Sequence, residues 1–395
     1  MRTRLIAFAI PLLIAAAIIG WQSGSAELPA APPLPTPLAI PAVPSPDGSA
    51  GPNDSAADPF ARSTRPEVRN LPEVPESTEA LPPLIFARTG QLYASTGDGS
   101  QPQQLTTFDE TTYAEQPAVS ADGAQIAFVA LIQPPAADTV PLPRSALWLI
   151  NRDGTALREL WAPADGIMYL PTWTPDASAI YLLVNTTYSA PDPAEDTTGV
   201  ERLAIVRVDT TTGETTIVRR GALDPVLSAD GSQMAFLNFG SDGIVMHLDI
   251  VATAGGEPRR VVDGTRFSQL YAPRFSPDGR QIIFSAVDGP ETDDAGYPLR
   301  ATSSLVETLA ALLAPPTAAA HGAPWDLWIV GSDGTGLRRL TWLYEDLPMG
   351  AFSPDGTQIA VLGYNGVYLL NPDGSQVRRL VLDPGHSGGI AWPAR

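Results

Sequence analysis

The chain has 395 residues and is 44% hydrophobic, so it can bury a large core in one sizeable domain or in two. Its 43 acidic and 24 basic side chains give a net charge of −19, which repels nucleic-acid phosphates and anionic lipid head groups and excludes nucleic acid as a partner. It contains no cysteine, which excludes disulfides, thiolate metal sites and a lipid-bearing cysteine.

The amino terminus, residues 1–26, has the pattern of a signal peptide or of a single membrane anchor. Arg2 and Arg4 precede an uncharged apolar run over residues 5–20, as in a secretory signal. Small residues up to Ala26 fit cleavage at that point, yet the run also approaches the ~17–25 residues that a retained anchor needs. We expect a protein outside the cytoplasm, either held in the membrane through residues 5–20 or periplasmic or secreted.

Residues 27–82 predict a proline-rich, disordered linker. The densest stretch, residues 31–37, has proline at four of its seven positions. Prolines remove backbone donors and favour an extended polyproline conformation, so we interpret the segment as a spacer. A peptide ligand for a partner is the alternative interpretation.

Residues 83–395 consist of repeats, and the repeats predict a β-propeller. The first marker is a tight turn of the type Phe-Ser-Pro-Asp-Gly, followed by a strand of alternating apolar residues. Proline presets the first corner of this turn, aspartate accepts hydrogen bonds from downstream amides, and glycine adopts a positive φ. The five full copies begin at Val119, Trp173, Leu227, Phe275 and Phe352.

A second turn recurs near the end of each repeat, between an apolar strand and a strand that usually ends in arginines. The six turns are Asp98-Gly99, Asp153-Gly154, Thr212-Gly213, Gly255-Gly256, Asp333-Gly334 and Asp373-Gly374. Six turns predict six blades. We interpret the arginines as charges that protect the outer edge strands against aggregation; an anion-binding stripe is the alternative.

The two ends of the repeat region complement each other. The first repeat, which begins at Leu84, lacks an inner strand, whereas residues 389–392 match an inner strand with nothing after it. We therefore expect the C-terminal strand to join the first blade and to close the ring, because closure removes free sheet edges.

These repeats resemble those of TolB-type, or WD-repeat-like, β-propellers over about residues 84–392. The Phe-Ser-Pro-Asp-Gly turns, the Trp-containing strands at 147–150 and 327–330, and the Asp-Gly turns carry the resemblance. It implies an all-β, six-bladed propeller that serves as a docking surface. Peptides or partner proteins are then held at a face or in the mouth of the central channel.

No catalytic or metal-binding constellation is visible in the sequence, and we expect no cofactor, no metal and no enzymatic activity. Ser387 lies in a Gly-x-Ser-x-Gly string, but a nucleophile elbow needs acid and base partners further along the chain, where only a short tail follows. The three histidines lack ligand spacing, and the acidic residues 291–294 lack the alternating ligands of a calcium loop.

Three long insertions are predicted to lie on one face, because the connections between second and third strands of a propeller all leave from the same side. They span about residues 132–145, 186–201 and 288–326. The third contains residues 301–314, whose leucines recur at helical spacing. We expect this helix to cover its own propeller, with docking to a partner or membrane as the alternative.

The loops between blades add aromatic and acidic residues to this face, a combination suited to peptide, cationic or carbohydrate ligands. The candidate binding residues are Phe108, Tyr113, Trp161, Tyr169, Phe267, Tyr271, Trp342, Tyr344, Asp263, Glu345 and Asp346, with Asp109, Glu115 and Asp165 interleaved. We expect a monomeric scaffold that binds a protein or peptide of the cell envelope. The alternative is a propeller hydrolase or lyase acting on a glycan or peptide. A sialidase-like enzyme would need arginines and carboxylates that face the axis, and no such cluster is visible in the sequence.

Overall fold

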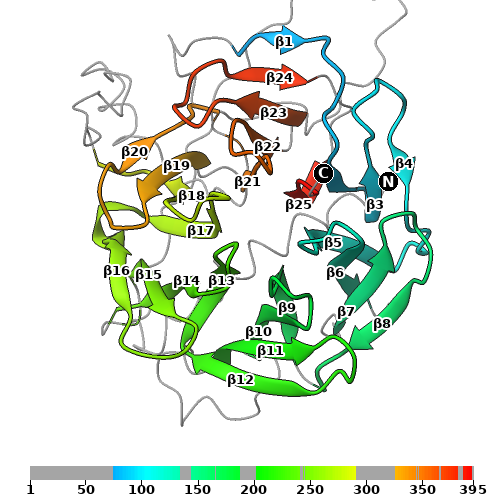
Figure 1. Cartoon of the computed structure of the whole chain (residues 1–395), viewed down its shortest axis with the longest axis horizontal. Helices are drawn as coiled ribbons and strands as arrows, with labels where there is room; N and C mark the ends of the chain where they lie inside the picture. The colour runs from blue at the N-terminus through cyan, green and yellow to red at the C-terminus, as the bar shows by residue number, and fades with distance from the viewer. Residues whose placement is uncertain are drawn as a thin grey trace, which may run out of the picture.

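The described part of the computed structural model comprises residues 74–133, 144–164, 166–186, 202–240, 243, 245–290, 325–343, 345, 347–363, 366–380 and 386–393. These residues form six sheets arranged around a central axis (Figure 1). The six-bladed, all-β fold expected from the repeats is therefore confirmed. Among the described residues there is no helix with the length and apolarity needed to cross a bilayer. The predicted signal or anchor, residues 1–26, and the predicted helix at 301–314 lie outside them.

The blades are numbered in chain order, and the strands of each are given from the axis outward. Blade 1 consists of β25 (His386–Ala391), β2 (Ile85–Arg88), β3 (Gln91–Ala94) and β4 (Gln103–Gln104). Blade 2 consists of β5 (Thr112–Val119), β6 (Gln125–Ile132), β7 (Arg144–Asn151) and β8 (Arg158–Trp161). Blade 3 consists of β9 (Ile167–Trp173), β10 (Ala179–Asn185), β11 (Leu203–Asp209) and β12 (Thr215–Arg220).

Blade 4 consists of β13 (Ala222–Leu227), β14 (Gln233–Phe239), β15 (Met246–Ala252) and β16 (Arg259–Val262), and the short 3-10 helix η4 (Gly264–Arg266) follows it. Blade 5 consists of β17 (Gln269–Phe275), β18 (Gln281–Val287), β19 (Trp325–Gly331) and β20 (Arg338–Arg339). Blade 6 consists of β21 (Met349–Phe352), β22 (Ile359–Gly363), β23 (Gly366–Leu370) and β24 (Arg378–Leu380), and it carries β1 (Glu76–Ser77) on its outer edge.

The ring closes through the C-terminal strand, as the repeat count predicted. β25 pairs antiparallel with β2, and Ile390 lies opposite Phe86. Both side chains are buried in one apolar cluster, against which Trp392 also packs. The last strand is therefore the inner strand of the first blade, and it joins the two ends of the propeller.

Strand β1 extends blade 6 to five strands. It pairs parallel with β24, placing Glu76 opposite Arg379, and these two side chains form an ion pair. Arg378 Nε lies 2.7 Å from a carboxylate oxygen of Glu79, and Val74 packs against the core cluster shared by blades 5 and 6. The linker was expected to extend to residue 82, so its last residues belong to the folded body instead. A strand of two residues is too short to show a periodic pattern in the sequence. It is held by Arg378 and Arg379 in β24, about 300 residues later in the chain.

The marker turns form for local reasons. In the first, Asp122 Oδ1 accepts hydrogen bonds from the hydroxyl of Ser120 at 2.6 Å and from the backbone N–H of Ala124 at 3.0 Å. Gly123 has a φ of 71°, a conformation in which glycine avoids the strain of a side chain. The same hydroxyl hydrogen bond recurs at Asp176, Asp230, Asp278 and Asp355. Glycine follows the aspartate in all of these turns except that of Asp176, where Ala177 has a φ of 56°.

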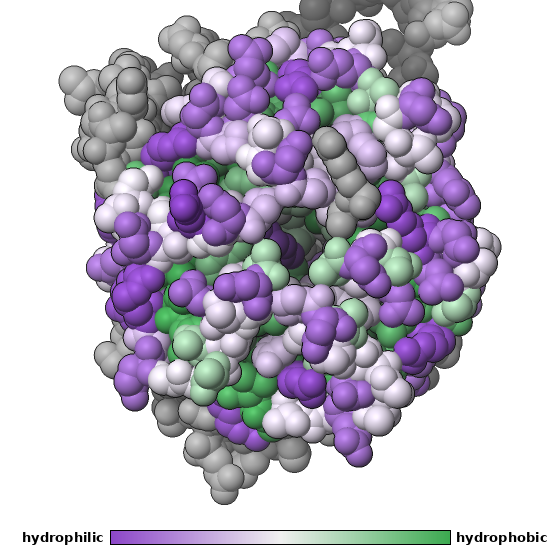
Figure 2. All heavy atoms as spheres, in the orientation of Figure 1, coloured by the Kyte–Doolittle hydropathy of each residue, from purple (hydrophilic) through white to green (hydrophobic). Residues whose placement is uncertain are grey.

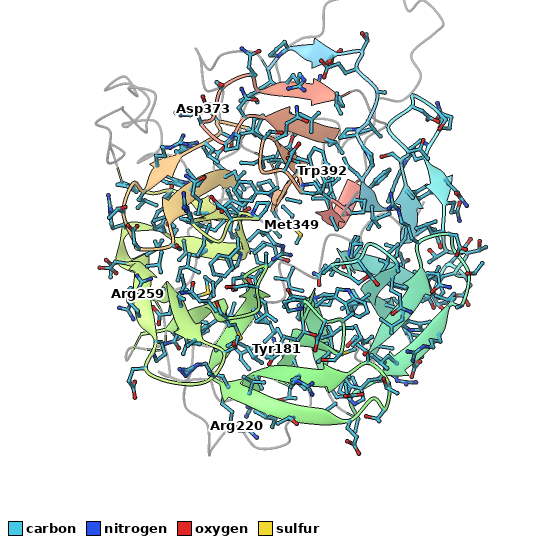
Figure 3. All side chains as sticks on the ribbon, in the orientation of Figure 1. Tyr181, Arg220, Arg259, Met349, Asp373 and Trp392 are labelled. Carbon is cyan, nitrogen blue, oxygen red and sulfur yellow. The ribbon has the colours of Figure 1, made fainter. Side chains whose placement is uncertain are left out.

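Arginines of the outer strands connect neighbouring blades. Arg158 of blade 2 donates to the carbonyl of Thr210 in blade 3 at 2.9 Å, and Arg338 of blade 5 donates to that of Asp373 in blade 6 at 2.7 Å. Arg259 of blade 4 donates to the carbonyl of Ser332 in blade 5. Arg220 and Arg259 lie at the rim of the disc and Met349 lies near its centre (Figure 3). These arginines therefore bind the turn of the next blade in addition to charging the edge.

Candidate functional site

The inner strands β5, β9, β13, β17, β21 and β25 surround the axis, and the surface is hollowed at the centre of the ring (Figure 2). Three of these strands approach each other closely at Gly389. A Cβ atom there would lie 3.1 Å from Cα of Gln116 and 3.4 Å from Sδ of Met349, and the residue has a φ of 109°. Glycine is needed at this point of the channel wall for both reasons.

Four inner strands share a bulge next to the axis, each at a non-glycine residue with positive φ that directly precedes a proline. The residues are Gln116 (φ 55°), Leu170 (φ 51°), Asp224 (φ 53°) and Ala272 (φ 50°). The pairing with the second strand shifts register at each of them. The conformation costs roughly 1–2 kcal/mol for a side-chain-bearing residue. The proline that follows has no backbone N–H to donate, so it fits a position where the hydrogen bonds between the two strands are interrupted.

Side chains at two of these bulges bind the bulge of the next blade. The side-chain oxygen of Gln116 in blade 2 accepts the N–H of Leu170 in blade 3 at 2.7 Å. Likewise, Oδ2 of Asp224 in blade 4 accepts the N–H of Ala272 in blade 5 at 3.1 Å. The strained backbone is thus held by polar contacts between neighbouring inner strands.

Two buried carboxyl groups belong to the same wall. Asp224 is 1% exposed, and its Oδ1 has no hydrogen-bond partner among the described residues. Glu115 in blade 2 is 7% exposed. Burial raises the pKa of Glu115 to about 7. Burial also raises the pKa of Asp224 to about 7, although the Ala272 N–H and the Arg274 charge oppose this shift.

Tyr271 and Arg274 in β17 are half-buried and complete the group. Burial raises the pKa of the Tyr271 hydroxyl far above its ordinary value, with added effects of the charges on Asp224 and Glu115. Burial lowers the pKa of Arg274, whose Nη1 donates to the Pro273 carbonyl at 2.8 Å. Blades 2 and 5 stand opposite each other in the ring, so Glu115 acts on Tyr271 across the channel. We call Glu115, Asp224, Tyr271 and Arg274 the axial cluster.

Of the residues that the sequence placed on the rim of this face, Tyr271 and Glu115 belong to this cluster. Several of the predicted aromatic residues pack between blades instead. The Phe108 ring lies edge-on to Trp148 with centroids 5.6 Å apart, and the Phe267 ring lies edge-on to Trp328 at 4.9 Å. Trp161 packs against the apolar cluster between blades 2 and 3.

The remaining candidates are also dispersed. Tyr169 is buried, Tyr113 packs beside the core, and the Trp342 ring lies under the Arg339 guanidinium at 5.4 Å. Glu345 is buried and accepts a hydrogen bond from the Tyr368 hydroxyl. Tyr344 and Asp346, together with Asp165, lie outside the described residues.

Phe108 and Asp263 lie in connections between blades, and these connections are hydrogen-bonded to side chains of the preceding blade. Near the start of the third strand, Gln91, His247 and Asp326 each accept a backbone N–H from the chain that leaves the fourth strand. The donors are Phe108 at 3.0 Å, Gly264 at 3.1 Å and Leu343 at 2.6 Å, respectively.

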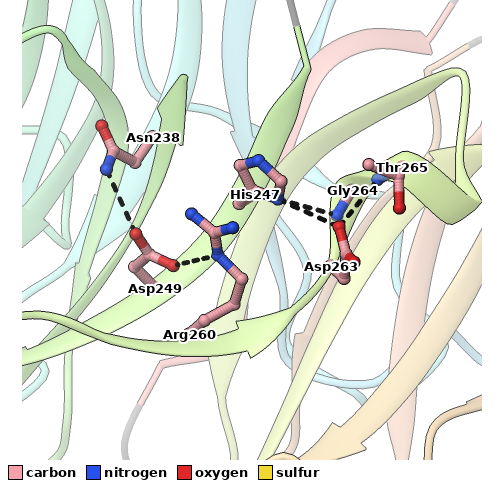
Figure 4. Close-up of polar contacts among 7 residues, drawn as sticks. All are labelled: Asn238, His247, Asp249, Arg260, Asp263, Gly264 and Thr265. Atoms are coloured by element: carbon pink, nitrogen blue, oxygen red, sulfur yellow. Dashed lines mark hydrogen bonds and ion pairs between the residues drawn. The ribbon is translucent and has the colours of Figure 1, made fainter. Parts of the chain in front are cut away.

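In blade 4 these contacts also involve Asp263. Its Oδ1 lies 3.3 Å from His247 Nδ1 and accepts the N–H of Thr265 at 3.1 Å (Figure 4). Nearby, Asp249 accepts from Asn238 at 3.2 Å and from Arg260 at 3.3 Å. The contacts of His247 and Asp263 hold the between-blade connection in place on the face toward which the insertions leave, whereas those of Asp249 join strands within blade 4.

Asp224 and Arg274 were not among the sequence candidates. The available signal was the recurring residue before proline in the inner strands, at Gln116-Pro117, Leu170-Pro171, Asp224-Pro225 and Ala272-Pro273. A polar residue at that position borders the axis. The sequence showed no axial arginine or carboxylate cluster, whereas the folded chain places one arginine and two carboxyl groups within electrostatic range of the Tyr271 hydroxyl.

Comparison with known proteins agrees with this architecture. Residues 90–341 match the family model of the lipoprotein LpqB β-propeller domain. TolB from Acinetobacter baumannii superposes with a TM-score of 0.53 at 17% identity, over 79% of this chain and 66% of that one. A chain of a nidogen/laminin complex superposes with a TM-score of 0.52 at 10% identity, over 78% of this chain and 97% of that one.

At these identities the structural likeness shows the fold alone, and this chain spans just under two thirds of the TolB chain. No curated protein matches the sequence. The family match, in contrast, covers well over half of the residues, and it includes the inner strands of blades 2–5. The chain therefore belongs to the family of the lipoprotein LpqB β-propeller domain.

Proposed function

We propose that this protein is an exported binding platform that holds a protein or peptide of the cell envelope on one face of its propeller. The observation that carries the proposal is the unequal construction of the two faces. One face consists of short turns of nearly constant length. The other carries every long connection between second and third strands.

We call the side from which the connections between second and third strands leave the connection-bearing face. In blade 1 this connection is only Thr89 and Gly90, and the flanking residues Arg88 and Gln91 pair with each other. The equivalent connections of blades 2, 3 and 5 span residues 133–143, 186–202 and 288–324. Connections that vary in length over a regular frame are where propellers and other scaffolds place their binding residues. This face also surrounds one mouth of the axial channel.

The envelope location is supported by two independent features. Residues 1–26 have the composition of an export signal or anchor. The matching family is that of a lipoprotein's propeller domain. The ligand is accordingly sought among envelope proteins.

Site-specific photo-crosslinking in the native envelope tests the proposal. A photoreactive amino acid is placed at Gln133 or Asp288, where insertions leave the body, and at Thr211 or Glu257 in the turns of the other face as matched controls. We expect the same partner to be captured from the first pair and not from the second. Capture from the turn face alone would contradict the proposal.

A glycan hydrolase is the second candidate, because the axial cluster contains two carboxyl groups with an arginine and a tyrosine. Glycosidases use paired carboxyl groups as acid and base or nucleophile. Chromogenic glycosides offered to the purified protein distinguish the two functions. We expect no turnover; turnover that is abolished by Glu115→Gln and Asp224→Asn would favour the hydrolase.

A further inference from the structure

We infer that the axial cluster is a receptor for one basic side chain, an ammonium or guanidinium group presented by a polypeptide ligand. This inference rests on the proposed binding function and names the chemistry that the channel recognises. Its starting point is the unpartnered carboxylate oxygen of Asp224.

One carboxylate oxygen of Asp224 fixes the side chain in place, and the other is left without a partner. Oδ2 accepts the Ala272 N–H at 3.1 Å, while Oδ1 lacks a partner among the described residues although the side chain is 1% exposed. A buried acceptor without a donor is unfavourable, and native structures rarely retain one without a reason. A ligand that brings an N–H donor to Oδ1 removes this cost.

The charges of the cluster select a monocation. Arg274 acts electrostatically on Asp224, so it balances one of the two carboxylates. Glu115 has no such counter-ion in the cluster, which leaves one negative charge when both carboxyls are ionised. Tyr271 adds an aromatic ring of the kind that attracts ammonium and guanidinium groups. The net charge of −19 on the chain favours the approach of cations over that of anions.

Binding of such a group is coupled to proton release. Burial raises the pKa of Glu115 and of Asp224 to about 7, so at neutral pH part of the population carries a proton on each. A bound cation favours the ionised carboxylates and expels these protons. Arg274 and the Ala272 N–H face Asp224, and the Tyr271 hydroxyl lies within electrostatic range of both carboxyls. Affinity is therefore expected to fall as the pH drops below 7.

Calorimetric titration of the full chain with capped tripeptides tests the inference. The probes are Gly-Arg-Gly and Gly-Lys-Gly, with Gly-Gln-Gly as the neutral control and calcium chloride as a separate arm. At pH 7.5 the basic peptides are expected to bind and to release protons, which is measured in two buffers of different ionisation enthalpy. Binding at pH 5.5 is expected to be weaker by about 20-fold for each carboxyl that must ionise, since a carboxyl of pKa about 7 is then largely protonated.

Isosteric variants separate binding from folding. Asp224→Asn and Glu115→Gln are expected to lose most of the binding while the melting temperature at pH 7.5 is kept or raised, because each removes a buried charge. Asp230→Asn in an exposed turn of blade 4 is the matched control, and we expect it to bind normally.

Equal binding of Gly-Gln-Gly, or unchanged binding in both axial variants, would overturn the inference. If calcium binds and the tripeptides do not, and if Asp224→Asn abolishes calcium binding, the ligand of the axial cluster is a metal ion and the inference is wrong. If no tripeptide binds while photo-crosslinking still captures a partner from the connection-bearing face, this inference fails and the proposed function stands.

Discussion

The turn aspartates and the axial carboxyls are the same chemical group in opposite environments. Hydroxyl hydrogen bonds from Thr174 and Ser228, with backbone N–H groups, lower the pKa of the exposed Asp176 and Asp230 to about 2. Burial raises the pKa of Glu115 and Asp224 to about 7. The first environment is made by a few neighbouring residues, and the second exists only when blades 2, 4 and 5 meet around the axis.

The two environments affect stability with opposite sign. A turn aspartate has a folded pKa below its unfolded value, so its contribution is complete above about pH 4 and is lost as the pH falls through about 2. An axial carboxyl has a folded pKa above its unfolded value. It therefore costs stability increasingly as the pH rises from about 4 to about 7. The turns maintain the fold, whereas the axial cluster lowers its stability, as functional sites often do.

The largest effect on stability is expected when the ring is opened. A chain truncated before Gly389 loses the second half of β25 with Ile390, and also Trp392 directly after the strand, and it exposes the edge of β2. Loss of a packed large aromatic alone costs about 3–5 kcal/mol, a large part of a domain's ~5–15 kcal/mol. We expect aggregation or a much lower melting temperature by calorimetry. An unchanged melting temperature would show that the pairing of β25 with β2 contributes nothing to stability.

Removal of an axial charge is expected to have the next largest effect on stability. Asp224→Asn is expected to raise stability by about 1–3 kcal/mol at pH 8, because the buried carboxylate no longer has to ionise. Urea unfolding measures this gain, which should shrink as the pH is lowered from 7 to 4. A loss of stability at pH 8 would mean that ionised Asp224 stabilises the fold.

The same chemical change in a turn should have the opposite sign. Asp176→Asn weakens the hydrogen bonds from Thr174 and Ser178, so we expect a lower melting temperature at pH 8. Unlike the axial effect, this loss should persist at pH 4, where Asp176 is still ionised in the folded protein. Thermal melts at both pH values provide the measurement, and Asp224→Asn is the paired variant.

The smallest effect is expected at β1, where contacts are distant in sequence but exposed. Deletion of residues 1–80 removes the ion pairs of Glu76 with Arg379 and of Glu79 with Arg378, whereas deletion of residues 1–73 keeps them. Exposed pairs contribute about 0.2–1 kcal/mol each, so the longer deletion should melt slightly lower, and less so in high salt. Identical melting of the two bodies would show that β1 adds no stability.

The blade count, the marker turns and the ring closure could be predicted from the amino-acid sequence. Turn chemistry acts over about five residues, and strand periodicity over one strand, so each copy could be read independently and then counted. The missing inner strand before Leu84 and the unpaired one at residues 389–392 complement each other without any knowledge of packing. That is why these predictions were confirmed by the pairing of β25 with β2.

The positions at which side chains from different blades meet depend on how the blades pack in the folded ring. Phe108 and Phe267 are between-blade residues in the sequence, but their rings pack edge-on to Trp148 and Trp328 because neighbouring sheets leave apolar space there. Glu115 and Asp224 come from blades 2 and 4 and become buried beside the axis only when the ring closes, which depends on the twist and packing of all six sheets. Local patterns encode the repeated unit, and the environment at the axis arises from the closed assembly of six of them.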